Sequence, residues 1–302
     1  MSAPSVLYDT PGPRAKQRNA LYTVIFILVG AGVLYLLVSG MNEKNQLDWD
    51  KWSPYLAGTE AWTTYLLPGL QATLLAAGLS IVMALPIGAI FGIARLSDHA
   101  WIAKTAGTLV EFFRAIPVLI LMFFAFTVYV EFTDFGRDIR PLYAVCTGLV
   151  IYNSAVIAEV VRAGILSLPK GQTEAALAVG LRKGQLMTSI LLPQAVTAML
   201  PALVSQVVVI VKDTALGGAL LNYSELMAQA RPAAAFYGGN VIATLTVIAA
   251  IFIVINSLLS WFASWLEGWL RRRKKGTGAV VGAEMVEEQA PGMGITEMPT
   301  GR

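Results

Sequence analysis

Long apolar runs separated by short polar segments dominate the chain. Each run has about twenty residues or more, enough for a helix to cross the roughly 30 Å of bilayer hydrocarbon. No stretch alternates polar and apolar residues with period two, as the strands of a membrane barrel would. The pattern therefore predicts an all-α integral membrane protein with six transmembrane helices. The runs cover residues 21–41, 66–94, 109–130, 142–161, 195–221 and 241–270.

The composition agrees with a membrane protein. Hydrophobic residues make up 56% of the chain and charged residues 14%, with a mean hydropathy of +0.64, whereas a soluble domain has about 25% charged residues. The one cysteine, Cys146, excludes a disulfide within the chain, and we expect it to be a packing residue. The one histidine, His99, is expected in a solvated loop. No grouping of His, Cys and carboxylates predicts a metal site.

The segments outside the apolar runs define the predicted domains. The first run is longer than the apolar part of a signal peptide and is followed by no A-x-A site, so we expect a transmembrane helix rather than a cleaved signal. The end of the chain mixes Gly, Pro, Thr and Glu without periodicity, which is typical of disorder. The predicted order is an N-terminal tail (1–20), a first transmembrane helix (21–41), an extracytoplasmic loop (42–65), a transmembrane domain (66–271) and a basic, then disordered, C-terminal tail (272–302).

The distribution of Lys and Arg predicts the orientation. With the N-terminus inside, the cytoplasmic flanks hold Arg14, Lys16, Arg18, Arg95, Lys104, Lys170, Arg182, Lys183 and the basic block 271–275. The outer segments then hold Lys44, Lys51, Arg137, Arg140 and Arg231. Because short cytoplasmic flanks carry the excess of cations, both termini are predicted to lie in the cytoplasm.

One cytoplasmic loop, residues 163–193, is much longer than a turn requires. Its middle, residues 174–181, contains good helix formers and predicts a short helix. Ala175, Ala176 and Val179 are predicted to share one face, where small side chains would let another surface approach closely. Gly180 costs about 1 kcal/mol in a helix relative to alanine, so it suits a bend or a close backbone contact. The loop is therefore expected to be a docking site.

The spacing in this loop resembles the signature of ABC importer permeases. It reads Glu174-Ala175-Ala176, three residues, Gly180, nine residues, Ile190, one residue, Leu192-Pro193. The stretches 111–117 (EFFRAIP), 169–172 (PKGQ) and 212–214 (KDT) are similar to the polar amino acid branch of that family, the His/Glu/Gln/Arg-type importers. The resemblance covers residues 66–271, and within the branch the chain is most similar to glutamate-type permeases of high-GC Gram-positive bacteria.

The resemblance implies a fold, a set of partners and a mechanism. The type I importer permease fold would have a five-helix core, from the second to the sixth run, plus an added N-terminal helix. Such permeases work in pairs in the cytoplasmic membrane, bind two copies of an ATPase and receive substrate from an extracytoplasmic solute-binding protein. The seven signature residues (Glu174, Ala175, Ala176, Gly180, Ile190, Leu192 and Pro193) would contact the ATPase, and alternating access would move a polar amino acid, with glutamate or aspartate favoured.

No phosphate-binding G-x-x-x-x-G-K-[ST] motif occurs in the sequence. The chain is therefore expected to be a transport subunit without its own ATPase site and not an enzyme. It would bind no cofactor, with ATP and Mg held by the partner ATPase, and it would contact membrane lipids but no nucleic acid.

Polar residues within the apolar runs are candidates for the substrate pathway, because ions in hydrocarbon are costly and usually face a cavity or a partner. Lys212, Asp213 and Thr214 fall in the outer half of the fifth run, and Asn153 near the middle of the fourth. Lys212 could attract a substrate carboxylate, with Thr214 and Asn153 donating hydrogen bonds. The alternative is that Lys212 and Asp213 pair with neighbouring helices and only stabilise the bundle.

Two pairs of opposite charges have the i,i+3 spacing of a helix surface, Glu159 with Arg162 and Glu111 with Arg114. We expect structural pairs in both cases, with a gate as the alternative. Pro117, just inside the third run, is expected to kink or start a helix.

Two other classes of protein fit the sequence less well. A self-sufficient secondary transporter or channel often carries inverted repeats with broken helices, and the sequence has no convincing repeat. A membrane-embedded enzyme would need clustered catalytic residues, which one His and one Cys do not supply. The sequence leaves open which amino acid is carried, whether the partner permease is identical or a homologue, and what the first helix and the C-terminal tail do.

Overall fold

The computed structural model describes residues 12–275, and every regular element in that range is a helix. The predicted C-terminal tail from residue 276 and residues 1–11 lie outside the described residues. In chain order the helices are α1 (Pro13–Glu43), α2 (Trp49–Leu56), η1 (Trp62–Leu66), α3 (Leu67–Ala94), α4 (Ala100–Ala115), α5 (Val118–Phe132), α6 (Arg140–Leu166), α7 (Lys170–Ala178), α8 (Lys183–Leu186), η2 (Met187–Leu191), α9 (Leu192–Leu220), α10 (Ala230–Phe236) and α11 (Val241–Lys275). The two η elements are π-helices.

Five stretches of the described chain are long and apolar enough to cross a membrane, and a sixth arises if α4 and α5 count as one span. These two helices are bent by 97° relative to each other, so the prediction of one helix over 109–130 is wrong. The break falls at Ile116, which is extended with φ −90° and ψ 128°. A following proline excludes the helical conformation by steric contact, which confirms the expected role of Pro117.

Other predicted boundaries also shift. The loop after the second run ends at His99, because α4 begins at Ala100. Residues 13–20 are not a tail but the first turns of α1, which has a proline in its first turn, where the missing N–H costs nothing. The segment 42–65 is not a plain loop either, since it contains α2 and most of η1.

The chain divides into two compact units. The first combines the described part of Met1–Leu66 with Ala230–Val247. Within it, the Tyr55 hydroxyl of α2 forms a hydrogen bond with the Thr244 hydroxyl, and its ring meets Tyr237 edge to face, with centroids 5.7 Å apart. The Asn240 amide donates to the Lys51 carbonyl at 3.1 Å. The part of segment 42–65 around α2 is thus folded, although α1 itself has no buried residue.

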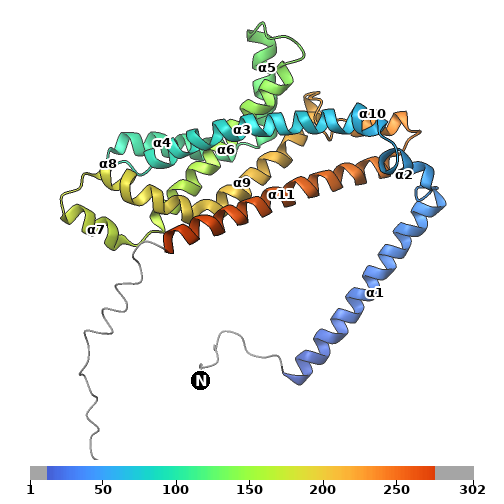
Figure 1. The fold of residues 1–302 in the computed structure, drawn as a ribbon, viewed down its shortest axis with the longest axis horizontal. Coiled ribbons are helices and arrows are strands. Elements are labelled where there is room, and N and C mark those ends of the chain that lie inside the picture. Colours follow the sequence, from blue (N-terminus) through green and yellow to red (C-terminus); the bar gives the residue numbers. More distant parts are fainter. Residues whose placement is uncertain (1–11, 276–302) are drawn as a thin grey trace, which may run out of the picture. The chain divides into compact units, whose positions relative to one another are not determined.

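The second unit, Leu67–Gln229 with the chain from Ile248, is built around α6. In the most apolar window of α6, 67% of the residues are buried, against 28% or fewer in the other four spans. The helices α3 and α9 lie beside α6 (Figure 1), and small residues let them approach it closely. Gly88 and Gly92 of α3 lie against Ile157 and Val161 of α6, a spacing of small residues typical of membrane helix packing.

The same unit has a buried cluster beneath the long loop. It joins residues of α3, α6, α7, α8, η2 and α9, which are Ala84, Ile157, Val161, Ile165, Ala176, Leu186, Met187, Leu191, Ala195 and Met199. We call it the loop cluster. The loop cluster spans six elements. The long loop is therefore packed against the ends of the three long helices α3, α6 and α9.

Candidate functional site

The long loop, called the coupling loop below (residues 163–193), begins and ends in helices. Its first part is the end of α6, and α7 starts earlier and ends earlier than predicted. Gly180 lies beyond the end of α7 with φ +83°, in the left-handed region that favours glycine. The Gly180 N–H donates to the Leu177 carbonyl at 3.0 Å, and the Leu181 N–H donates to the Ala176 carbonyl at 3.1 Å. This is a Schellman C-cap, so the expected bend at Gly180 is confirmed.

The structure divides the seven signature residues into two groups. Glu174, Ala175, Gly180 and Pro193 are exposed. The other three, Ala176, Ile190 and Leu192, pack into or against the loop cluster.

The predicted common face of Ala175, Ala176 and Val179 is therefore wrong. Ala176 is only 5% exposed and faces the protein, whereas Val179 is 78% and Leu177 52% exposed. Leu177 and Val179 therefore place two exposed apolar side chains beside the exposed signature residues. The sequence analysis missed Leu177, although a leucine in a short polar helix outside the apolar runs was a usable signal.

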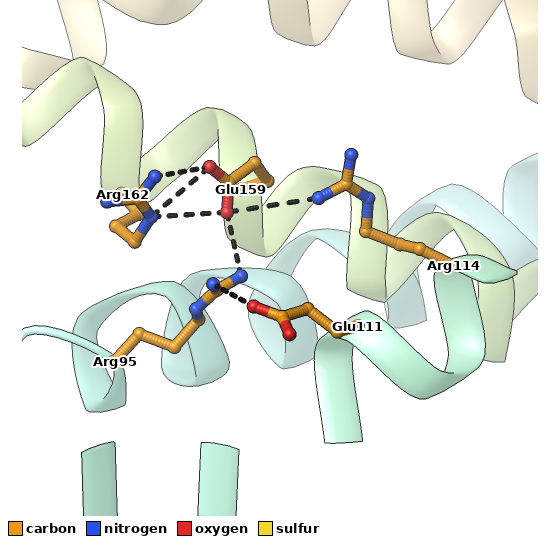
Figure 2. Close-up of polar contacts among 5 residues, drawn as sticks. All are labelled: Arg95, Glu111, Arg114, Glu159 and Arg162. Carbon is orange, nitrogen blue, oxygen red and sulfur yellow. Dashed lines mark hydrogen bonds and ion pairs between the residues drawn. The ribbon is translucent and has the colours of Figure 1, made fainter. Parts of the chain in front are cut away.

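Charged residues gather at the ends of α3, α4 and α6 (Figure 2). The Arg162 guanidinium donates to the Glu159 carboxylate at 2.5 Å, which confirms the predicted i,i+3 pair. The second predicted pair does not form. Glu111 instead accepts a hydrogen bond from Arg95 at 3.1 Å, and Arg114 lies 3.9 Å from Glu159.

Arg95 is the residue that the sequence analysis missed in this group. It directly follows α3, its side chain is 12% exposed, and it donates to Glu159 at 2.7 Å. The sequence analysis named Arg95 only as one of the cations of the predicted cytoplasmic flanks. The five residues Arg95, Glu111, Arg114, Glu159 and Arg162 are called the charged cluster below.

Lys212 on α9 borders two cavities. One has a volume of about 440 Å³ and the other about 570 Å³. Both are also lined by Ser260 of α11, and their other polar lining residues are Ser205, Asn256, Ser257 and Ser264. Lys212 is exposed and belongs to no ion pair among the described residues. A cation in an apolar span, beside hydroxyl groups and open space, can attract an anionic group.

The other candidates of the apolar runs do not line these cavities. Thr214 is buried and donates to the Val211 carbonyl at 2.7 Å. Asn153 is buried, donates to the Leu149 carbonyl at 2.8 Å, and accepts a hydrogen bond from the Gln206 amide. Asp213 is half-buried. Lys212 is thus the one residue of the predicted set that lines these two cavities.

A buried carboxylate was missed altogether. Glu225 lies between α9 and α10 with no exposed surface, and it accepts hydrogen bonds from the Met227 and Ala228 N–H groups, each at 2.7 Å. Burial raises the pKa of Glu225 and outweighs these two donors, which act in the opposite direction. Burial likewise raises the pKa of Tyr223 to about 12, and its hydroxyl donates to the Ala72 carbonyl at 2.7 Å. The Tyr223 contact joins the segment after α9 to α3.

The remaining residues behave as expected. Cys146 is buried in the core formed by α3, α5, α6 and α9, with its sulfur 3.7 Å from the Ala76 carbonyl. His99 is exposed immediately before α4.

A bundle of apolar spans, with a folded loop packed on its core and a cation beside cavities within the spans, is the architecture of a multi-pass membrane transport subunit. Residues 84–272 match the family model described as "Binding-protein-dependent transport system inner membrane component". The chain belongs to this family, the permeases of ABC importers, and is a multi-pass protein of the cytoplasmic membrane.

Individual relatives agree with this. The chain is 44% identical over 231 residues to the glutamate transport system permease protein GluD of Corynebacterium glutamicum, covering 76% of this chain and 84% of the relative. It is 32% identical to the glutamate/aspartate import permease protein GltK of Escherichia coli, covering 57% of this chain and 75% of the relative. Among solved structures, an amino acid ABC transporter crystallised with histidines has a TM-score of 0.60 at 27% identity, covering 68% of this chain and 94% of that chain. The methionine transporter MetNI has the same fold, with a TM-score of 0.56 at 22% identity, covering 71% of this chain and 99% of that chain.

Proposed function

We propose that this chain is the membrane subunit of an ABC importer for acidic amino acids, driven by a separate ATPase that binds the coupling loop. The observation that carries the proposal is the two-sided loop. Ala176, Ile190 and Leu192 pack into or against the loop cluster, while Glu174, Ala175 and Gly180 are exposed beside Leu177 and Val179. A surface of this kind can receive a partner and pass its movement to the helices behind it.

The partner ATPase, in two copies, would hold ATP and Mg, since the sequence has no phosphate-binding motif of its own. Nucleotide would act by binding one of two global states more tightly than the other. Pro193 lies in the first turn of α9, which directly follows η2. A movement of η2 would therefore be passed to the helix that carries Lys212. A second permease, identical or homologous, and an extracytoplasmic solute-binding protein complete the assembly.

Lys212 is proposed to meet the substrate carboxylate in the cavities between α9 and α11. Two relatives of the chain, a glutamate permease and a glutamate/aspartate permease, support an acidic amino acid as the substrate. Asn153 and Thr214 would hold the helices around these cavities in place through their hydrogen bonds within the bundle. Asp213 would act beside Lys212. Both termini would lie in the cytoplasm, as the distribution of Lys and Arg favours.

The test is uptake of labelled amino acids by proteoliposomes that contain this chain with its co-purifying ATPase and permease partners and its binding protein. We expect uptake of glutamate or aspartate that requires ATP. Uptake of another amino acid would reject the role of Lys212 and keep the importer class. Uptake without any ATPase would favour the self-sufficient transporter.

A further inference from the structure

The corner between α3 and α4, residues 95–99, contacts both the charged cluster and the coupling loop. It is short, and α4 begins directly after it. Three of its side chains make long-range contacts in the described chain: Arg95, Leu96 and Asp98.

Arg95 faces the helices. It donates to Glu159 of α6 at 2.7 Å and to Glu111 of α4 at 3.1 Å (Figure 2). A guanidinium can bind two carboxylates at once because its donors form a rigid fork. Arg95 therefore ties the corner to two different helices, and Glu159 is in turn held by Arg162 at 2.5 Å.

Leu96 and Asp98 face the coupling loop. Leu96 packs against the loop cluster, which includes Ala176 of α7 and Leu186 of α8. Asp98 forms an ion pair with Lys183, the first residue of α8. The corner thus touches the coupling loop on one side and the charged cluster on the other.

The helix that follows the corner is not fully packed. An apolar cavity of about 140 Å³ lies between α3, α4 and α6, lined among others by Phe91, Val110 and Phe113. Beyond α4, the chain is extended at Ile116 and turns by 97° into α5. A helix with an extended residue at its end and a void along its side can change its angle to α6, since a few such terminal residues absorb the rotation in hinge motions.

We propose that this corner is a second link through which movement of the coupling loop reaches α4, with Asp98 and Arg95 as positioning residues. Lys183 would pull or release the corner through Asp98, and Arg95 would pass the movement to Glu111 and Glu159. The inference rests on the proposed function, since it needs an ATPase that moves the coupling loop. It adds α4 to the helices that respond, besides α6 and α9, which the loop joins directly.

The ion pair between Lys183 and Asp98 can be tested directly. The side chains of Lys183 and Asp98 are 44% and 71% exposed, and exposed ion pairs contribute little to folding stability. Substitutions there should leave the protein folded and assembled. Any effect on transport then reports on the link rather than on stability.

The experiment measures labelled amino acid uptake and ATP hydrolysis together, in proteoliposomes holding the complete transporter and its binding protein. The variants are Asp98→Lys, Lys183→Asp and the double charge swap. We expect each single variant to lower uptake per ATP hydrolysed by about fivefold or more, within the usual range of coupling between sites. The double swap should return the ratio to within about twofold of the original protein, because the ion pair forms again in reverse.

The matched control is Lys104→Asp. Lys104 is an exposed cation on α4 and belongs to no ion pair in the described part of the chain, so the ratio should not change. The inference would be overturned if both single variants kept the uptake per ATP hydrolysed of the original protein. A double swap that fails to restore this ratio would overturn it as well. Absence of ATP-dependent uptake in the unmodified chain would instead reject the proposed function.

Arg95→Lys tests the contact of Arg95 with Glu111 and Glu159. Lysine keeps the charge but lacks the fork that reaches both carboxylates. We expect the assembled complex to hydrolyse ATP while uptake per ATP falls. An unchanged ratio would show that Arg95 transmits nothing to α4.

Discussion

The Arg95 guanidinium donates to the Glu159 carboxylate at 2.7 Å, although the two residues are 64 positions apart in the chain. This contact joins the end of α3 to α6, the most buried span. It also explains why Glu111 does not pair with Arg114, its neighbour on the helix. The Glu111 carboxylate pairs with Arg95, and the Arg114 guanidinium lies 3.9 Å from the Glu159 carboxylate instead.

Glu159→Gln should destabilise the protein, because it removes the negative charge that three arginines share in a partly buried site. We expect a loss of about 1–3 kcal/mol, as for hydrogen bonds to charged groups, measured as a lower unfolding temperature in detergent. Glu111→Gln is the control. Its side chain is 70% exposed with one partner, so about 0–1 kcal/mol is expected. Equal losses would contradict the central role of Glu159.

Gly88→Ala should weaken the contact between α3 and α6. An added Cβ would lie 2.7 Å from the Ile157 Cβ and 2.9 Å from the Ser154 carbonyl oxygen. The expected cost is about 1–3 kcal/mol, the usual range for overpacking. Gly78→Ala on the same helix is the control, because its Cβ would meet nothing within 4 Å. Thermal unfolding in detergent separates the two, and a stable Gly88→Ala protein would argue against close packing here.

Gly180→Leu should reduce uptake per ATP hydrolysed while the protein remains in the membrane. A leucine at φ +83° is strained by about 1–2 kcal/mol, which would distort the C-cap of α7 and the exposed face before it. Gly136→Leu is the control, since that exposed glycine lies outside the coupling loop and has no positive φ. Normal uptake by the Gly180 variant would reject the docking role of this turn.

Lys212→Met should reduce transport of an acidic amino acid more than that of a neutral one. Losing a hydrogen bond to a charged group corresponds to about 10–100-fold, measured as uptake in proteoliposomes. Lys104→Met removes a cation on α4 and should affect neither substrate. If both substrates lose equally with Lys212→Met, the lysine only stabilises the bundle.

Glu225 should make stability depend on pH. Burial raises its pKa in the folded protein above the value of 4.5, so the folded state binds the proton more tightly than the unfolded state does. Its contribution to stability is fully present below pH 4.5 and is lost as pH rises through the raised pKa. Acidification from neutral pH should therefore raise the unfolding temperature in detergent relative to Glu225→Gln. A constant difference between the two proteins over that range would contradict this.

The sequence by itself determined the spans and the coupling loop. Apolar runs long enough to cross a bilayer can be read without knowing their neighbours, because the surrounding lipid selects them one helix at a time. The break at Pro117 follows from local sterics in the same way. The signature from Glu174 to Pro193 identified the loop, and the family match over residues 84–272 agrees with it.

Only the tertiary structure decided which faces and partners these residues have. Ala176 faces inward and Ala175 outward, a difference that residue type does not encode. Glu111 pairs with Arg95 and not with Arg114, and Glu225 is buried although it belongs to a segment that the sequence shows only as polar. Each outcome depends on contacts between helices far apart in the chain. Periodicity reports the environment of one helix, whereas the partner of a charge is set by whichever helices pack beside it.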